Sequence, residues 1–155
     1  MREEFTFSLI ARTRDKLLKQ AEQCPADQRN VVPDGFNNNI LWQMGHVLTV
    51  TDGLVFGISG HPSECPASYR SFFGNGTKPA DWSEEPPAWE TIMEQLKDQP
   101  NRIQAVLSRK LSSGLTKENF MKAESIDELL QFHIMHESMH SGMVSGLLKA
   151  LNRKA

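Results

Sequence analysis

Apolar residues recur at the three- and four-residue spacing of an α-helix along four long segments of this chain. No segment shows the two-residue alternation that is typical of a half-buried strand. Four helices without a sheet predict an all-α fold, a four-helix bundle in which each helix buries one apolar stripe. A chain of 155 residues is long enough for one such core, so we expect a single domain over residues 1–155.

The first two predicted helices lie in the N-terminal third of the chain. The first spans residues 3–23, and the second begins at one of the three asparagines at 37–39 and runs to about residue 59. Gly53 and Gly57 are poor helix formers inside the second helix. Their presence suggests that another backbone approaches the helix closely at these positions.

The other two predicted helices lie in the second half of the chain. The third begins at the proline pair of residues 86–87 and runs to about residue 111, with Pro100 expected to kink or split it. Ser125 and Glu128 predict a capping box for the fourth helix, which runs almost to the C-terminus.

A long loop, residues 60–86, separates the second and third predicted helices. Proline and glycine recur through it and leave little room for regular structure, yet aromatic residues such as Tyr69 and Phe73 are interspersed. Long loops of this kind are often functional. The loop either covers one end of the bundle or forms the wall of a pocket.

The charge balance argues against several classes of partner. There are 17 Lys and Arg against 19 Asp and Glu, and no long basic run, so we expect no nucleic acid and no anionic membrane as a partner. The most apolar stretch, residues 40–58, is interrupted by polar side chains, so we do not expect it to span a membrane. Cys24 and Cys65 lie far apart, and Glu3 and Glu4 stand where a signal peptide is basic and then apolar, so we expect a cytoplasmic protein.

Three of the histidines form a candidate metal site. His136 and His140 are four residues apart, so they project from one face of the fourth predicted helix, one turn apart. They share its inward apolar stripe, where an unpaired polar nitrogen costs roughly 1–3 kcal/mol. His46, from the second helix, would complete a three-nitrogen site with a vacant position, as in catalytic metal centres. The alternative is that these are ordinary hydrogen-bonded core histidines.

Two further residues of the fourth helix are candidates for the surrounding pocket. His133 lies about 10 Å along the helix axis from His140, so we interpret it as a pocket or supporting residue rather than a ligand. Glu137 is rotated about 100° from His136, which places it at the edge of the site or at another helix interface.

The same residues spell H-E-x-x-H, the zinc-protease signature in which Glu137 would be the general base. No His, Asp or Glu follows His140 to act as a third ligand, and no strand is predicted that would hold a peptide. We therefore disfavour the protease interpretation.

Two motifs resemble those of a known family. Residues 38–47, which read NNILWQMGHV, resemble the second-helix signature of the DinB-like superfamily, small four-helix proteins in which a histidine follows a tryptophan-bearing turn. Residues 130–142, which end in His136, His140, Ser141 and Gly142, resemble the fourth-helix motif of that family. The long loop followed by a helix at Trp89 is similarly placed, so the resemblance covers most of the chain.

The resemblance implies an up-down-down-up bundle, a homodimer, and a divalent metal held by His46, His136 and His140. Zinc or nickel is the expected metal, with manganese and iron as alternatives. Some relatives transfer low-molecular-weight thiols such as bacillithiol or mycothiol, one subgroup isomerises maleylpyruvate, and many have no assigned activity. Ser141 stands where many relatives have a basic residue, which makes the substrate class less certain.

We therefore expect a metal-dependent thiol S-transferase that joins a small thiol to an electrophilic small molecule. Three neutral imidazoles leave the metal its +2 charge, which lowers the pKa of a bound thiol and generates the thiolate nucleophile. A metal-dependent hydrolase, or a non-enzymatic metal-binding or stress-related protein, is the alternative.

No catalytic side chain is identified beyond pocket candidates. Trp42 precedes His46 by one helical turn, so it is expected to stack beside that ring. Together with loop residues such as Tyr69 and Phe73, it would line a pocket for an apolar electrophile. Ordinary core packing is the alternative for Trp42.

Overall fold

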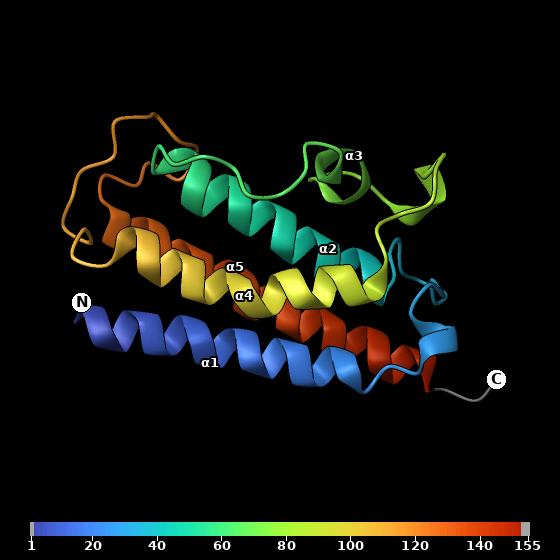
Figure 1. Ribbon diagram of the computed structural model, residues 1–155. Coiled ribbons are helices and arrows are strands. Elements are labelled where there is room, and N and C mark those ends of the chain that lie inside the picture. Colours follow the sequence, from blue (N-terminus) through green and yellow to red (C-terminus); the bar gives the residue numbers. More distant parts are fainter. Residues whose placement is uncertain (1, 153–155) are drawn as a thin grey trace.

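The computed structural model describes residues 2–152, and within this range the chain forms five α-helices (Figure 1). Four are long and one, α3, is short: α1 (Glu3–Glu22), α2 (Ile40–Thr51), α3 (Tyr69–Phe73), α4 (Trp89–Leu107) and α5 (Ile126–Leu151). The only β-type pairing among residues 2–152 is one isolated bridge. The prediction of an all-α fold is confirmed.

The four long helices lie alongside one another, with α1 and α5 running in one direction and α2 and α4 in the other (Figure 1). The helix α1 contacts α4 and α5, and α2 packs against the same two helices. The helices α1 and α2 are therefore diagonally opposite each other. Across residues 2–152, no helix has both the length and the apolar character that crossing a membrane requires.

Side-chain caps fix where the two histidine-bearing helices begin. Asn39 caps α2, since its Oδ1 accepts a hydrogen bond of 2.8 Å from the backbone N–H of Trp42. The hydroxyl of Ser125 accepts from the N–H of Glu128 at the start of α5. The Glu128 carboxylate accepts from the N–H of Glu124 instead of Ser125, so only half of the predicted capping box forms.

The second predicted helix is α-helical over α2 and then continues as a π-helical turn, Asp52–Gly57. A Cβ atom added at Gly53 or Gly57 would meet nothing within 4 Å, so the expectation of a close backbone there is wrong. The close approach is at Gly45, where a Cβ atom would lie 2.4 Å from the ring of Phe73. The missing side chain at position 45 therefore lets α3 pack directly on α2.

The helix α4 begins at Trp89 and continues through Pro100, so proline does not split it. Proline has no N–H, and the carbonyl of Leu96 therefore lacks the hydrogen bond that position 100 would donate in a regular helix. Nη1 of Arg14, on α1, donates to this carbonyl over 2.8 Å. A side chain from a neighbouring helix thus satisfies the acceptor that proline leaves open.

The segment between the π-helical turn and α4 is more regular than its proline and glycine content predicts. It contains α3 and a 3₁₀ turn, Pro79–Asp81. Phe73 and Tyr69 are buried, and the Phe73 ring meets those of Phe72 and Trp82 at centroid distances of 5.9 Å. The aromatic side chains hold this segment against α2 and so order it.

Candidate metal centre

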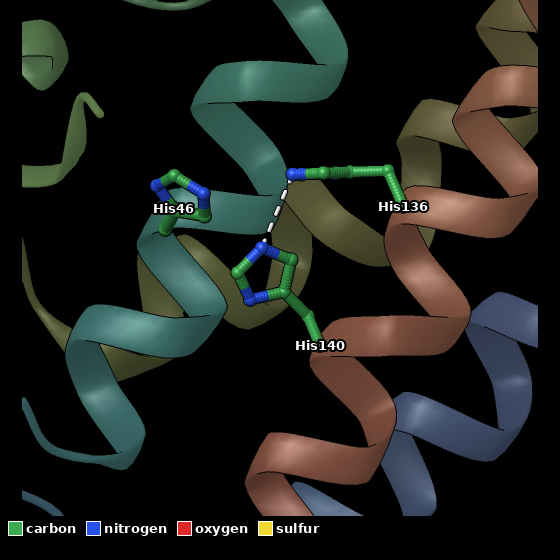
Figure 2. A group of neighbouring side chains, drawn as sticks. All are labelled: His46, His136 and His140. Carbon is green, nitrogen blue, oxygen red and sulfur yellow. Dashed lines mark hydrogen bonds between the residues drawn. The ribbon is translucent and has the colours of Figure 1, made fainter. Parts of the chain in front are cut away.

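His46, His136 and His140 meet between α2 and α5 (Figure 2). One ligand nitrogen from each ring lies within 4.8 Å of the other two, and the Nε2 atoms of His136 and His140 are 3.1 Å apart. Nitrogens bound at about 2.0–2.1 Å around a tetrahedral zinc ion lie about 3.3 Å apart. The spacing of His136 and His140 therefore already suits two ligands of one divalent ion, and the third nitrogen lies within 4.8 Å of both.

Hydrogen bonds fix which nitrogen two of the rings present to the shared space. Nδ1 of His46 lies 2.7 Å from the backbone carbonyl of Phe73, which can only accept, so this nitrogen carries the proton. Nδ1 of His140 likewise donates to Oε1 of Gln43 over 2.7 Å. Both rings are left with a lone pair on Nε2, the form a metal ligand requires.

His136 is the third histidine of the candidate site. Its Nε2 faces His140, whereas no hydrogen bond from the described residues fixes its Nδ1. Its Nδ1 is buried and has no hydrogen-bond partner among residues 2–152. The ring of Phe132 stacks on it at a centroid distance of 6.3 Å and an interplanar angle of 15°. A neutral ring with one orphaned nitrogen and the other facing His140 suits a ligand better than a structural histidine.

The three rings are held in their neutral form. Burial lowers the pKa of His46 and of His136 below the ordinary value. Burial, with the neighbouring His46 and His136, lowers the pKa of His140 to about 3. Neutral imidazoles can donate lone pairs to a cation without first losing a proton.

A cavity of about 480 Å³ opens beside the three histidines. Besides the rings, its lining consists of Asn38, Trp42, Gln43, Val50, Leu54, Asn75, Phe120, Phe132, Met139 and Met143. A volume of this order is typical of sites that bind small molecules. An ion at the three nitrogens would therefore border a space in which a substrate fits.

Trp42 stacks on His46 as its spacing predicts. The two ring centroids are 4.5 Å apart with an interplanar angle of 15°. The indole N–H donates to the hydroxyl of Thr77 over 2.9 Å, so the segment between α2 and α4 also holds this ring in place. Trp42 both lines the cavity and belongs to the core, which joins the two interpretations of this residue.

The loop aromatics do not line this cavity, contrary to expectation. The ring of Phe73 packs over Gly45 of α2, and its backbone carbonyl accepts the hydrogen bond from His46. The hydroxyl of Tyr69 donates to Oε1 of Gln95 on α4. The aromatic wall is formed instead by Phe120, which precedes α5, and Phe132, within it. Their rings meet edge to face at 5.5 Å.

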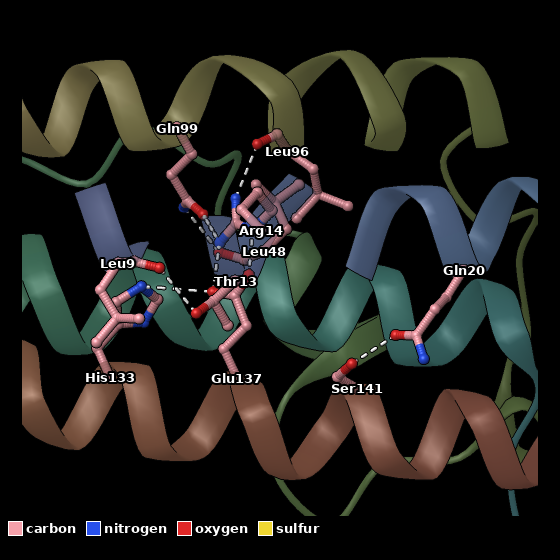
Figure 3. A network of polar contacts seen from close by, with 10 residues as sticks. All are labelled: Leu9, Thr13, Arg14, Gln20, Leu48, Leu96, Gln99, His133, Glu137 and Ser141. Atoms are coloured by element: carbon pink, nitrogen blue, oxygen red, sulfur yellow. Dashed lines mark hydrogen bonds and ion pairs between the residues drawn. The ribbon is translucent and has the colours of Figure 1, made fainter. Parts of the chain in front are cut away.

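Glu137 and His133 lie away from the cavity, in a buried polar cluster between α1, α4 and α5 (Figure 3). The Arg14 guanidinium donates to both carboxylate oxygens of Glu137, over 2.6 and 3.0 Å, and also to Oε1 of Gln99. Nε2 of His133 lies 3.4 Å from the same carboxylate. The 100° rotation of Glu137 from His136 therefore places it at another helix interface, the second of the two predicted positions.

The electrostatics of this cluster suit a fixed structural charge pair. Burial by itself raises the pKa of Glu137, but the Arg14 guanidinium, together with His133 and His136, lowers it by more, so the pKa lies below its ordinary value. Burial lowers the pKa of His133 to about 4, so the ring is neutral at neutral pH. A carboxylate paired in this way is not available as the general base of a zinc protease.

Ser141, the residue after His140, faces α1. It is buried, and its hydroxyl donates to Oε1 of Gln20 over 2.5 Å. The side chain at this position therefore contributes nothing to the lining of the cavity.

Several residues of the site were not predicted from the sequence. Gln43 lies one turn before His46, and Phe132 one turn before His136, so helical spacing alone could have placed both beside the ligands. Asn75 and Phe120 come from irregular segments, and no periodic signal in the sequence points to them.

A family model described as the DinB superfamily matches residues 9–144 of the chain. A search of curated proteins found no match.

Proposed function

The chain belongs to the DinB superfamily, and from that premise we propose that it is a metal-dependent enzyme whose ion is held by His46, His136 and His140. The approach of three neutral imidazoles from two helices is the observation that carries this proposal. The helix directions in Figure 1 support the up-down-down-up bundle that the resemblance implies. Zinc or nickel suits an all-imidazole donor set.

A divalent ion bound there would lower the pKa of an incoming thiol or water and so supply a nucleophile near neutral pH. The chain's own residues prepare the site for it. Gln43 and the Phe73 carbonyl orient two of the rings, while Trp42 and Phe132 stack on His46 and His136. The substrate would enter through the adjoining cavity.

We propose a thiol S-transferase rather than a hydrolase. A general base beside the metal-bound water often assists metal-dependent hydrolysis, as the glutamate does in zinc proteases. The residues that line the cavity within 2–152 include no Asp or Glu, and the nearby Glu137 is bound to Arg14. A thiol, with an ordinary pKa of about 8.5, needs only a modest shift to become a thiolate at neutral pH.

The experiment is a comparison of reactions in one metal-loaded sample. Conjugation of a small thiol to an electrophile such as monochlorobimane is measured beside the hydrolysis of an ester and an amide. Metal-dependent conjugation without hydrolysis is the expected result, and its loss in a His140→Ala variant assigns it to the site. Hydrolysis in the absence of conjugation contradicts the proposal, and metal binding with no turnover of either kind indicates a non-enzymatic protein.

A further inference from the structure

We infer that the cavity beside the three histidines takes a substrate with one metal-binding head group and an uncharged, apolar body. This inference rests on the proposed function, because the head group is defined by the ion. It adds the class of molecule that the rest of the site would recognise.

The wall of the cavity is apolar, although it is open to solvent. Phe120 is 74% exposed, and Met139 and Met143 on α5 are 47% and 43% exposed. Large apolar side chains that gather at the mouth of a cavity mark a surface that buries an apolar partner. Methionine adapts its flexible thioether to ligands of different shape.

The aromatic side chains connect this wall to the proposed ligands. Phe120 meets Phe132 edge to face, and Phe132 stacks on His136. A molecule whose head reaches the histidines would therefore lie along two phenyl rings. Aromatic pairs of this kind attract each other beyond the effect of burying their area.

The polar groups of the lining offer no charge to a substrate. Within the described residues 2–152, neither Lys nor Arg lines the cavity, and its polar members besides the histidines are three amides. The amide of Gln43 is already bonded at both ends, to Nδ1 of His140 and to Oδ1 of Asn38 over 3.0 Å. Carboxylates on the body of a substrate would lose hydration without gaining an ion pair.

The site therefore favours apolar thiols over acidic ones. For a thiol that carries several carboxylates, the ion would be the only positive group in the cavity. The sulfur of the thiol would already occupy the ion, so the carboxylates would have no positive partner. An aryl-methyl thiol can place its sulfur at the ion and its ring against Phe132. Ser141, the residue after His140, is bound to Gln20 on α1 and supplies no alternative contact.

The test uses the full chain loaded with zinc and labelled with ¹³C at its methionine methyl groups. Phenylmethanethiol is titrated beside the three ring isomers of (mercaptomethyl)benzoic acid and their methyl esters. The Met139 and Met143 signals should shift with the parent thiol and the esters, while each acid should bind at least about tenfold more weakly. Equal or tighter binding of the acids overturns the inference.

Met135 supplies a matched control, since it is 52% exposed on the same helix but does not line the cavity. Its signal should stay in place, and Met135→Ala should leave the affinity for phenylmethanethiol unchanged. Met139→Ala should weaken it at least about threefold. If Met139→Ala binds as tightly as the wild type, the wall is not a recognition surface.

A metal-free arm separates this inference from the proposed function. Benzyl alcohol and benzoate are titrated into protein stripped of metal, and benzyl alcohol alone should shift the Met139 and Met143 signals. If zinc does not bind but this preference holds, the proposed function fails and the apolar cavity stands. If zinc binds and the acids are preferred, the inference fails and the metal centre stands.

Discussion

The backbone carbonyl of Phe73 accepts a hydrogen bond of 2.7 Å from Nδ1 of His46, which connects α3 to the candidate metal centre. The ring of Phe73 is completely buried and packs over Gly45, the residue before His46. The absence of a side chain at position 45 thus controls how closely this carbonyl approaches the histidine. Partners of this kind fix the orientation and basicity of a ligand ring, and losing them typically costs 10–100-fold in metal affinity.

Gly45→Ala should weaken metal binding by about 10–100-fold and lower stability by about 1–3 kcal/mol. The new Cβ atom would lie 2.4 Å from the Phe73 ring, which must move and carry its carbonyl away from His46. Isothermal titration with zinc and urea denaturation measure the two effects. Gly142→Ala is the control, because its Cβ would meet nothing within 4 Å on the exposed side of α5. Unchanged zinc affinity in Gly45→Ala would show that the Phe73 carbonyl does not support His46 as a ligand.

His46→Ala should abolish tight 1:1 metal binding, because two histidines of one helix hold an ion far more weakly than three. His133→Leu should keep its metal, since this ring lies with Glu137 outside the cavity. Elemental analysis of purified, chelator-free protein measures both. Retention of stoichiometric metal in His46→Ala, or its loss in a folded His133→Leu, would show that the ligand set is different.

Metal should stay bound in mild acid. Free imidazole titrates near pH 6.5, but burial lowers the pKa of all three histidines, that of His140 to about 3. Protons therefore compete weakly with the ion until the pH lies well below 6.5. Zinc occupancy at about pH 5.5 should remain close to its value at pH 7, as measured by dialysis and elemental analysis. Half-release at or above pH 6.5 would contradict the buried arrangement.

The free energy of unfolding of the metal-free protein should fall as the pH drops from 6.5 towards 4. In this window the unfolded chain binds a proton at His133, whereas the buried ring, with a pKa of about 4, does not. His133 alone accounts for up to about 3 kcal/mol. Urea denaturation of wild type and His133→Leu across this range isolates its share, and the variant should show the shallower dependence. Glu137, whose pKa is lowered, acts in the same direction but below about pH 4.5. Parallel pH profiles for wild type and His133→Leu would contradict the assignment of this pH dependence to His133.

Arg14→Leu should destabilise the protein by about 3–5 kcal/mol, because it leaves the carboxylate of Glu137 buried without its partner. It also removes the donor to the Leu96 carbonyl that Pro100 leaves open. The double variant Arg14→Leu/Glu137→Leu should lose less than the sum of the two single changes, with a coupling energy of about 1–3 kcal/mol. Lys19→Ala, which breaks an exposed pair with Asp15, should leave stability unchanged. Additive single changes would show that the buried pair does not act as a unit.

The periodic part of the fold was predictable. The spacing of apolar residues located the four long helices to within a few residues, and the capping chemistry of asparagine and serine located the starts of α2 and α5. The segment between α2 and α4 was not, because its order comes from aromatic packing against α2 rather than from local propensity. Gly45 was missed for the same reason, since the ring that needs the space lies 28 residues further along the chain, at Phe73.

The helical period of the sequence determined that His136 and His140 share one face of α5, that Trp42 lies one turn from His46, and that Glu137 is rotated by about 100° from His136. These relations lie within single helices, whose geometry is the same in any fold. Only the tertiary structure decided that His46 meets the other two rings, that Gln43 and Phe73 set two tautomers, and that Phe120 forms part of the wall. These relations join different segments, and their geometry depends on how the helices pack, which no local pattern encodes.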